Sequence, residues 1–251
     1  MSKFISNGIT LDKVTGLEWQ QIDTDTVYTF NNAKEYCRDL NLGSKSDWRL
    51  PSVKELFSII DAGESMPAIN QTTFPETDSE AYWGSTLSLN VGERLFGVHF
   101  AIGRFMSLTP SNYHLVRCVR STGRNALASL LVDNGSGTVT DMASGLIWQQ
   151  QDDGTRRVQA GAISYCQGLA LTGSGDWRLS GIKELLSIVD FRALDPAIDT
   201  HLFPSTESRY WSASTNVINA DHAWLVSFIL GIATSRSKEN NSTYARCVRN
   251  K

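Results

Sequence analysis

Asp47-Trp48-Arg49-Leu50 returns later in the chain as Asp176-Trp177-Arg178-Leu179. The separation is 129 residues (177 − 48), and two further motifs keep it: Gly16-Leu17-Glu18-Trp19-Gln20-Gln21 returns as Gly145-Leu146-Ile147-Trp148-Gln149-Gln150, and Arg117-Cys118-Val119-Arg120 returns as Arg246-Cys247-Val248-Arg249. A period of this length indicates a whole duplicated domain, because solenoid repeats have periods of about 20 to 50 residues. We therefore expect two copies of one fold.

The 251 residues divide into a first domain over 1–123 and a second over 124–251. Each domain is long enough to bury a core of its own. The short polar stretch Ser121–Asn125 is the expected boundary, and Leu130-Leu131-Val132 is expected to begin the first strand of the second copy.

Composition excludes several classes of protein. Hydrophobic residues make up 41% of the chain and charged residues 20%, as in an ordinary soluble protein. The formal net charge of −3 argues against a nucleic-acid-binding protein, which would usually carry a basic surface. No apolar run approaches the roughly 18 residues of a membrane helix, so we expect no membrane insertion. The opening Met1–Ser6 is too short and polar for a signal peptide, which indicates an intracellular chain or one whose leader was removed.

The four cysteines follow the repeat. Cys37 matches Cys166 and Cys118 matches Cys247, so both copies have an internal spacing of 81 (118 − 37; 247 − 166). One cysteine near each end of a copy is typical of a long-range intradomain disulfide, and two buried free thiols per copy are the alternative. Disulfides imply an oxidising compartment. No Cys-x-x-Cys motif occurs, which argues against zinc-ribbon and thioredoxin sites.

Apolar positions spaced as on one face of a helix predict two helices in each copy. The first covers Asn32–Leu40 and places Cys37 on its buried face. The second begins at Ser52-Val53-Lys54-Glu55, which has the form of a capping box, and Gly181 replaces Ser52 in the second copy. Strands are predicted at Tyr82–Thr86, Phe96–Phe100 and His114–Arg120, with counterparts in the second copy. This order of elements predicts an α+β class, with two helices and a twisted, mainly antiparallel sheet per copy.

Several of these motifs together resemble one family. Asp133–Asp141 followed by Gly145–Gln149, the signature Asp47–Leu56, Pro67-Ala68-Ile69 with Phe74-Pro75, and the closing Arg-Cys-Val-Arg are similar to the C-terminal domain of the Legionella collagen-like adhesin. This is the Lcl C-terminal family, also designated domain of unknown function 1566. The resemblance covers nearly all of both copies. The first copy departs from the pattern at its shortened start, Asn7–Asp12, and the second copy departs from it at Ser180-Gly181.

The resemblance implies a fold similar to C-type lectins, in which a cysteine on the first helix bonds one on the last strand. It also implies secreted, periplasmic or cell-surface proteins, and binding to sulfated polysaccharides for the collagen-like adhesin. Formylglycine-generating enzymes share this broad fold and act through cysteines. That activity is disfavoured here because the cysteines are expected to form the disulfides Cys37–Cys118 and Cys166–Cys247.

The repeated aromatic and charged motifs have structural interpretations beside functional ones. The tryptophans of both copies, such as Trp19, Trp48 and Trp83, are expected in the core rather than as platforms that stack on sugars. Arg49 and Arg178 are expected to pair with Glu55 and Glu184 on the following helix rather than with a ligand.

The acidic stretches are interpreted in the same way. Asp133–Asp141 has oxygen ligands and glycines as in a calcium loop, but it lacks the distal Glu of an EF-hand, so a glycine-rich turn between two strands is favoured. Asp23-Thr24-Asp25 and Asp152-Asp153 are interpreted as solvated loop carboxylates.

No pattern indicates catalysis. The chain has no Gly-x-Ser-x-Gly motif, and its four histidines fall at no repeated position. We therefore expect a protein without enzymatic activity, cofactor or metal.

The late loops differ most between the copies, and binding residues tend to lie on such loops over a rigid frame. The expectation is binding by the second copy above all. The candidate side chains are Asn216, Asn219, Arg236, Lys238, Asn240 and Tyr244 in the second copy, and Arg94, Arg104, Asn112 and Tyr113 in the first.

These observations predict a non-catalytic binding or adhesion module that recognises a glycan, in particular an anionic polysaccharide, or a surface protein. The alternative is a structural subunit of a surface appendage or secreted complex. An enzyme of the formylglycine-generating type ranks third.

Overall fold

The computed structural model describes residues 3–5, 7–89, 92–122 and 130–251. The chain divides into two compact units, Met1–Leu127 and Ala128–Lys251. The boundary predicted between residues 123 and 124 lies outside the described residues. Each unit has its own core around its own disulfide.

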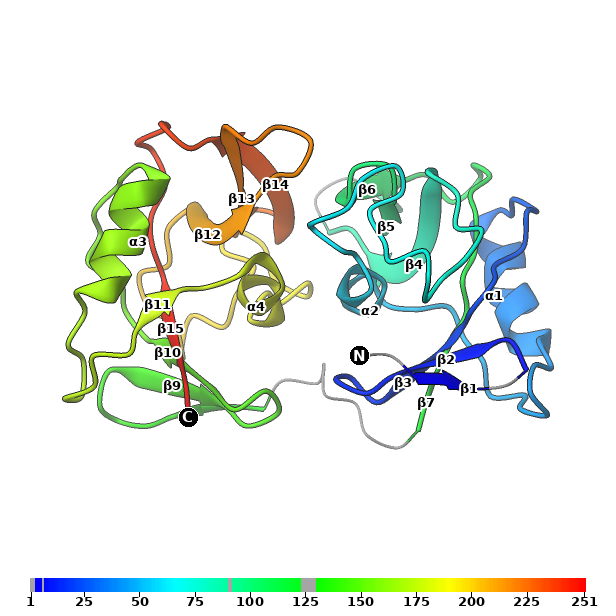
Figure 1. The fold of residues 1–251 in the computed structure, drawn as a ribbon, viewed down its shortest axis with the longest axis horizontal. Helices are drawn as coiled ribbons and strands as arrows, with labels where there is room; N and C mark the ends of the chain where they lie inside the picture. Colours follow the sequence, from blue (N-terminus) through cyan, green and yellow to red (C-terminus); the bar gives the residue numbers. More distant parts are fainter. Residues whose placement is uncertain (1–2, 6, 90–91, 123–129) are drawn as a thin grey trace. The chain divides into compact units, whose positions relative to one another are not determined.

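Both units run through the same order of elements except for one short strand, β11, which the second copy adds where the first has only an isolated bridge between Arg49 and Val119, and the class is α+β as predicted (Figure 1). In the first copy the elements are β1 (Lys3–Ile5), β2 (Ile9–Asp12), β3 (Leu17–Gln20), α1 (Phe30–Asp39), α2 (Val53–Ser58), β4 (Ala81–Leu87), β5 (Leu95–His99), β6 (Arg104–Leu108) and β7 (Val119–Ser121). In the second copy they are β8 (Leu131–Asp133), β9 (Thr138–Asp141), β10 (Leu146–Gln149), α3 (Gln159–Gln167), β11 (Arg178–Leu179), α4 (Ile182–Ser187), β12 (Arg209–Thr215), β13 (His222–Ser227), β14 (Ile232–Ser237) and β15 (Cys247–Asn250).

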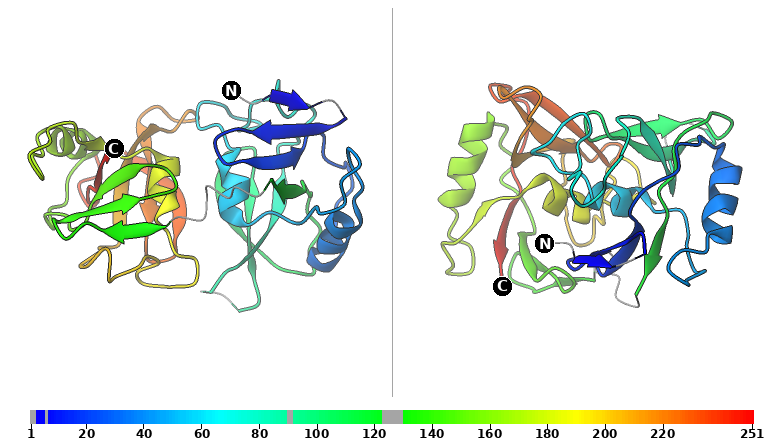
Figure 2. Two further views of the ribbon diagram at one scale, coloured as in Figure 1. Left: turned by 90° about the horizontal axis from the view of Figure 1, so that it is seen from below. Right: turned by 45° about the vertical axis from the view of Figure 1, so that its right-hand side comes forward.

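Each copy contains two antiparallel sheets, where the sequence predicted one. The terminal sheet has the strand order β1-β2-β3-β7 in the first copy and β11-β15-β10-β9-β8 in the second. The three-stranded sheets are β4-β5-β6 and β12-β13-β14. The two sheets of a copy lie at opposite ends of it, with the short helix α2 or α4 between them (Figures 1 and 2).

The predicted last strand, His114–Arg120, explains this difference. Leu115 forms a single parallel bridge with Tyr82 in β4, whereas Val119 begins β7 and pairs with Trp19 in the terminal sheet. The segment therefore passes from one sheet to the other, and its middle residues belong to neither ladder. Period-two patterning cannot reveal such a crossing, because the side chains alternate in and out along both sections.

The disulfides fasten the first helix of each copy to this crossing segment. Cys37 and Ala33 lie on the buried face of α1, and Cys37 is bonded to Cys118. Cys166 on α3 is bonded to Cys247 in the same way. Both predicted pairings are confirmed.

The repeated tryptophans form the core, as expected. Trp48 and its counterpart Trp177 are at most 3% exposed. Trp83 donates its indole N–H to the Tyr28 carbonyl at 2.6 Å, which satisfies the ring's polar atom within the core. The four fully buried tryptophans are Trp19, Trp83, Trp148 and Trp211.

The short helix α2 begins with the predicted capping box. The Glu55 amide donates to Ser52 Oγ at 3.3 Å, and the Ser52 amide donates to Glu55 Oε2 at 2.8 Å. Arg49 holds the same carboxylate through two hydrogen bonds of 2.8 and 2.6 Å, so the expected structural ion pair is confirmed. Arg178 and Glu184 repeat the pair at 2.7 and 2.6 Å.

The glycine-rich run Asp133–Asp141 is the hairpin between β8 and β9. Asp133 Oδ1 accepts the Gly135 amide at 2.8 Å, and the Asn134 side chain bonds Thr138 and Thr140 across the turn. Within the described parts of the chain, no cluster of three or more acidic, histidine or cysteine side chains could hold a metal ion. The same residues include no helix with the length and hydropathy of a membrane span.

Candidate functional site

Three segments of the second copy meet beside the end of its three-stranded sheet. The Arg157 amide donates to the Thr243 carbonyl at 2.9 Å, and the Gln159 amide donates to the Lys238 carbonyl at 3.0 Å. The Lys238 amide in turn donates to the Asp221 carbonyl at 2.8 Å. The segment before α3 and the loops on either side of the β13–β14 hairpin therefore form one continuous surface.

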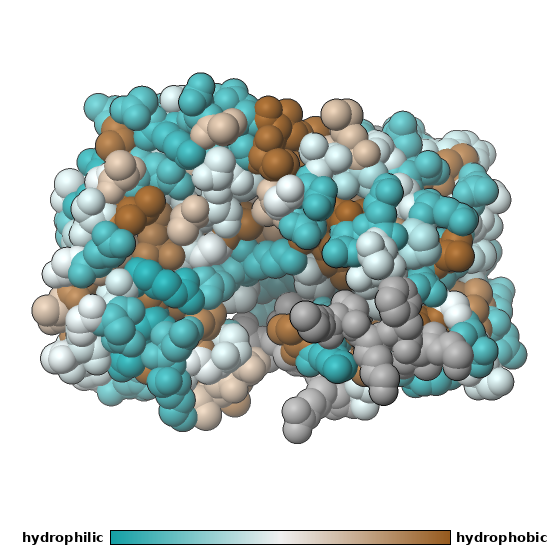
Figure 3. Space-filling model, in the orientation of Figure 1, coloured by the Kyte–Doolittle hydropathy of each residue, from teal (hydrophilic) through white to brown (hydrophobic). Residues whose placement is uncertain are grey.

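Four cations stand on these segments, namely Arg156, Arg157, Arg236 and Lys238, and we call them the basic surface. The Arg156 Nε donates to the Tyr244 hydroxyl at 2.8 Å, and its guanidinium lies over the Tyr244 ring. Arg236 occupies β14, with Nη1 at 3.5 Å from Ser242 Oγ. Figure 3 shows mainly hydrophilic residues along the upper edge of this copy, where the red segment before β15 runs in Figure 1.

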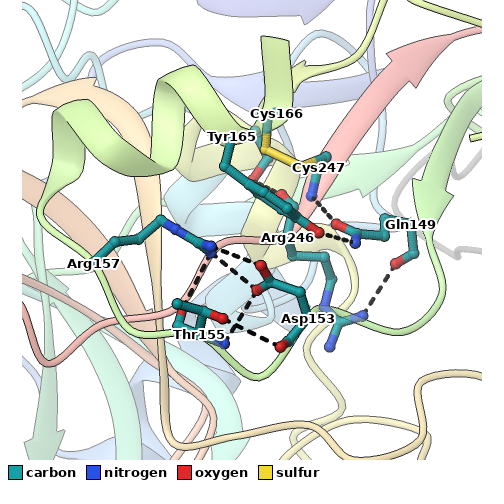
Figure 4. The surroundings of a disulfide bond; sticks show 9 residues. Gln149, Asp153, Thr155, Arg157, Tyr165, Cys166, Arg246 and Cys247 are labelled. Carbon is teal, nitrogen blue, oxygen red and sulfur yellow. Dashed lines mark hydrogen bonds and ion pairs between the residues drawn. A yellow bond between two sulfur atoms is a disulfide. The ribbon is translucent and has the colours of Figure 1, made fainter. Parts of the chain in front are cut away.

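Arg157 is the one member of the basic surface whose charge is compensated by a direct ion pair. Its guanidinium binds the Asp153 carboxylate at 2.7 Å and covers the Tyr165 ring at 4.3 Å from the centroid (Figure 4). The hydrogen bond from Arg157 lowers the pKa of Asp153 below its ordinary value. Within the described residues, Arg156, Arg236 and Lys238 form no such ion pair.

The same positions in the first copy are uncharged. Tyr28 donates to His114 and Phe30 donates to Pro110, which matches the Arg157–Thr243 and Gln159–Lys238 bonds. Leu95 pairs with Leu108 as Ala223 pairs with Arg236. The four cations therefore replace residues that carry no charge in the first copy: Val27, Tyr28, Leu108 and Pro110.

The segments that carry the basic surface also carry acidic residues. Asp153, Asp221 and Glu239 lie on the same segments as the four cations, and Glu207 attracts Arg156 electrostatically, so positive and negative side chains are equal in number (4 and 4). Asp152 lies on the same segment but is buried beside Arg246, whose charge it compensates. Exposed charges of this kind act over a Debye length of about 8 Å at physiological ionic strength. The surface can therefore attract an anionic group locally without making the whole protein basic.

The structure brings together four of the six residues predicted in the second copy. Arg236, Lys238 and Asn240 lie half-buried along β14 and the loop after it, and Asn219 is exposed on the adjoining loop. The Asn240 side-chain oxygen accepts the Ser242 amide at 3.1 Å, and Asn219 accepts the Asp221 amide, so both amides also shape their loops.

Asn216 and Tyr244 require a correction, because both are buried. Asn216 donates to Ser235 Oγ at 3.0 Å and accepts the Ile218 amide, which closes the β12–β13 connection. Tyr244 bridges to Tyr210 in β12 and is 4% exposed, so its ring belongs to the core side of the crossing segment. The Asn216 amide is used within the β12–β13 connection, and the Tyr244 hydroxyl accepts the hydrogen bond from Arg156.

The four residues predicted in the first copy do not form one site. Arg94 lies at the start of β5, where its Nη1 donates to the Ser107 carbonyl at 3.4 Å, whereas Arg104 pairs with His99 at the far end of the β5–β6 hairpin. Strands of this length separate them by more than about 13 Å. Asn112 and Tyr113 are exposed on the later loop.

A buried charge network was missed by the sequence interpretation. Asp23, expected to be a solvated loop carboxylate, accepts hydrogen bonds from Arg117 at 2.6 Å and from the Tyr82 hydroxyl at 2.5 Å. Both the Arg117 and Asp23 side chains are at most 1% exposed. Burial raises the pKa of Asp23 despite the neighbouring guanidinium. Asp25 is exposed, so only half of that stretch behaves as expected.

The second copy repeats this network, with Asp152 beside Arg246 at 3.5 Å and in contact with the Tyr210 hydroxyl. Arg246 also donates to the Gln149 and Gln150 carbonyls at 3.1 and 2.6 Å. The network therefore fixes the chain where it leaves β10 and runs towards Arg156 and Arg157. The constant spacing of Asp23 and Asp152 (152 − 23 = 129) was the available signal, inside a stretch that otherwise differs between the copies.

The comparison with known families identifies the fold of both copies. The model of the Lcl C-terminal domain matches the chain twice, over residues 8–120 and 137–249. The chain belongs to the Lcl C-terminal domain family. The resemblance drawn from the repeated motifs is thus confirmed for both copies. Among curated proteins, none matches the chain.

The two Lcl C-terminal domains share the features that hold the fold: the disulfide, the tryptophans, the helix-start ion pair and the buried Arg–Asp–Tyr network. They differ at the basic surface. Shared features specify the scaffold and cannot distinguish one partner from another, so the surface where the copies differ is the candidate site.

Proposed function

We propose that the protein is a non-catalytic binding module whose second copy recognises an anionic polysaccharide through the basic surface. The observation that carries the proposal is the replacement of four uncharged residues of the first copy by Arg156, Arg157, Arg236 and Lys238. Three of these cations have no ion-pair partner among the described residues, so they remain available to an anionic ligand.

The side-chain chemistry suits sulfate or carboxylate groups carried on a sugar chain. A guanidinium offers planar pairs of donors that match these oxyanions, and a lysine supplies a point charge. The exposed Asn219 and the half-buried Asn240 add amide groups beside the cations that can bond hydroxyls. A repeating anionic polymer would meet Arg156 and Arg236 with successive groups.

Two further observations support this class of function. The most deeply buried ionisable groups, such as Asp23 and Arg117, are enclosed in the core and offer no surface to a substrate. Both cysteine pairs are disulfides, and disulfides persist in oxidising compartments. We therefore place the protein outside the cell, in the periplasm or at the cell surface, as part of the same proposal.

Heparin is a suitable anionic probe. The wild-type protein should bind a heparin column at about 50 mM salt and elute before about 300 mM, the range over which screening deepens. Arg236→Ala/Lys238→Ala should elute at clearly lower salt, because it removes two of the three uncompensated cations. Circular dichroism and the melting temperature show whether the variant is folded.

Arg38→Ala/Arg192→Ala is the matched control. It makes the same change in net charge at two exposed arginines that already pair with Asp39 and Asp190. It should elute with the wild type. Co-elution of all three proteins would contradict the proposed site and favour a structural subunit of a surface appendage.

A further inference from the structure

The second copy has a cavity of about 370 Å³ between α3 and the start of α4. It does not share residues with the basic surface. Ile163, Leu179 and Ala213 form its apolar wall, from α3, β11 and β12 respectively. Helix α3 begins beside the basic surface at Gln159 and ends at Gln167, which lines the cavity. The two ends are eight residues apart, which is about 12 Å along the helix.

An ion pair lies at the polar side of this cavity. Arg178 donates two hydrogen bonds to the Glu184 carboxylate, at 2.7 and 2.6 Å, and the Gly181 amide donates a third at 2.7 Å. The two side chains remain 41% and 27% exposed. Arg178 therefore keeps N–H donors that Glu184 does not use, and Glu184 Oε1 keeps an acceptor position.

The first copy closes the equivalent place. Glu55 makes the same pair with Arg49, but its side chain is only 4% exposed. Ser52 stands where the second copy has Gly181, and its hydroxyl covers the helix start by accepting the Glu55 amide. Lys34 stands where the second copy has Ile163, so an apolar wall has replaced a cation. The second copy therefore exposes a carboxylate that the duplicated scaffold can bury.

The composition of the cavity selects the kind of ligand. An anion would meet Glu184, a cation would meet Arg178, and neither charge would be compensated without breaking their pair. A neutral group with adjacent hydroxyls can accept from the guanidinium and donate to the carboxylate at once. Its apolar face would then cover Ile163 and Leu179, as sites for small molecules combine apolar walls with a few directed polar groups.

We propose that this cavity binds a single neutral sugar ring, with adjacent hydroxyls on Arg178 and Glu184 and the C–H face of the ring on Ile163 and Leu179. The proposal is independent of the anionic polysaccharide site, because the two sites share no residue.

Nuclear magnetic resonance of the full chain tests this proposal directly. The probes are the methyl glycosides of glucose, galactose, mannose and N-acetylglucosamine, each up to about 50 mM, because one ring in an open cavity is expected to bind with a Kd of about 1 mM or weaker. At least one glycoside should shift the Arg178 Nε–H signal and the Gly181 amide in a saturable manner. The Arg49 Nε–H signal of the first copy is the internal control and should stay in place.

Ile163→Lys/Gly181→Ser is the blocking variant, and it introduces only residues that the first copy already carries. Gly181 has a φ of −70°, and a Cβ there would meet its nearest neighbour, Glu184 Oε2, at an ordinary contact distance of 3.4 Å, so the variant should fold. Its affinity for the responding glycoside should fall at least about tenfold. The absence of any saturable Arg178 shift with all four glycosides, an equal shift at Arg49, or an unchanged affinity in the folded variant would overturn the proposal.

Discussion

The Asp23 carboxylate compensates the charge of a fully buried guanidinium. Arg117 also donates to the Gln20 and Gln21 carbonyls and to Thr77, so its position is fixed from several sides. If Asp23 is removed, the arginine stays buried without a counter-charge, which is far more costly than the loss of an exposed ion pair.

We therefore expect Asp23→Ala to lower the free energy of unfolding by about 3 to 5 kcal/mol. Asp25→Ala, two residues away at an exposed position, should change it by less than about 0.5 kcal/mol. Urea unfolding of both variants, with tryptophan fluorescence as the recorded signal, measures the difference. Equal effects would mean that Asp23 is solvated after all.

Sequence reasoning separates these two aspartates poorly for a physical reason. The partner of Asp23 is 94 residues away along the chain, and only the folded core brings them together. The tryptophans and cysteines were easier to place. A large apolar ring is most stable in the core, and a cysteine spacing that repeats in both copies indicates a disulfide within each copy. Tyr244 was misplaced because a tyrosine on a divergent segment fits both a binding loop and a core edge.

The helix α2 depends on a few polar contacts at its start. It has only six residues, and helices this short owe their stability to capping and packing. The capping box and the Arg49 pair converge on one carboxylate, that of Glu55. Burial alone would raise the pKa of Glu55, but the hydrogen bonds from Arg49 outweigh burial and hold the pKa below its ordinary value.

This lowered pKa predicts a pH dependence with a definite sign. The unfolded chain protonates Glu55 near pH 4.3, whereas the folded protein keeps it ionised to lower pH. The contribution of Glu55 is therefore complete above about pH 4.3 and disappears as the pH falls through the folded-state pKa. The difference in unfolding free energy between wild type and Glu55→Gln should be largest at pH 7 and should shrink towards pH 3.

Urea titrations of the two proteins at pH 7, 5 and 3 measure this difference. A gap that stays constant, or that widens in acid, would show that Arg49 does not stabilise the ionised carboxylate.

The helices and strands that the sequence predicted well are those with a regular spacing of apolar residues along the chain. The helix at Asn32–Leu40, observed at Phe30–Asp39, follows from apolar spacing, and the strand at Tyr82–Thr86 lies within β4. The predicted strand His114–Arg120 failed as a single element because its pairing partners belong to two sheets. Pairing partners are distant in sequence, so no local pattern records them.

The whole molecule consists of two units with separate cores and separate disulfides. Removal of one disulfide should therefore weaken one unit and spare the other. Cys166→Ala/Cys247→Ala should lower the unfolding free energy of the second unit by about 2 to 5 kcal/mol. Amide hydrogen exchange should become faster in α3, while the rates in α1 stay as in the wild type. Equal acceleration in both helices would contradict independent units.

Duplication also explains how much of the candidate site the sequence could predict. The divergence of the late loops singled out Arg236 and Lys238, and the structure places both at the end of one hairpin. Arg156 and Arg157 were not predicted, since they precede α3 and reach the surface only through backbone pairing with the segment that contains Thr243. The matched backbone hydrogen bonds and strand registers of the two copies show that all four cations replace uncharged residues.

The central claim is that the second copy, and not the first, binds an anionic polysaccharide at the basic surface. Chemical-shift mapping of the full chain with a heparin oligosaccharide tests it most directly. The account predicts saturable shifts for amides of residues 155–159 and 236–243, which weaken as salt rises, and unmoved amides at the equivalent residues 26–30 and 108–114. Shifts centred on the first copy, or no shift at the basic surface at low salt, would contradict it.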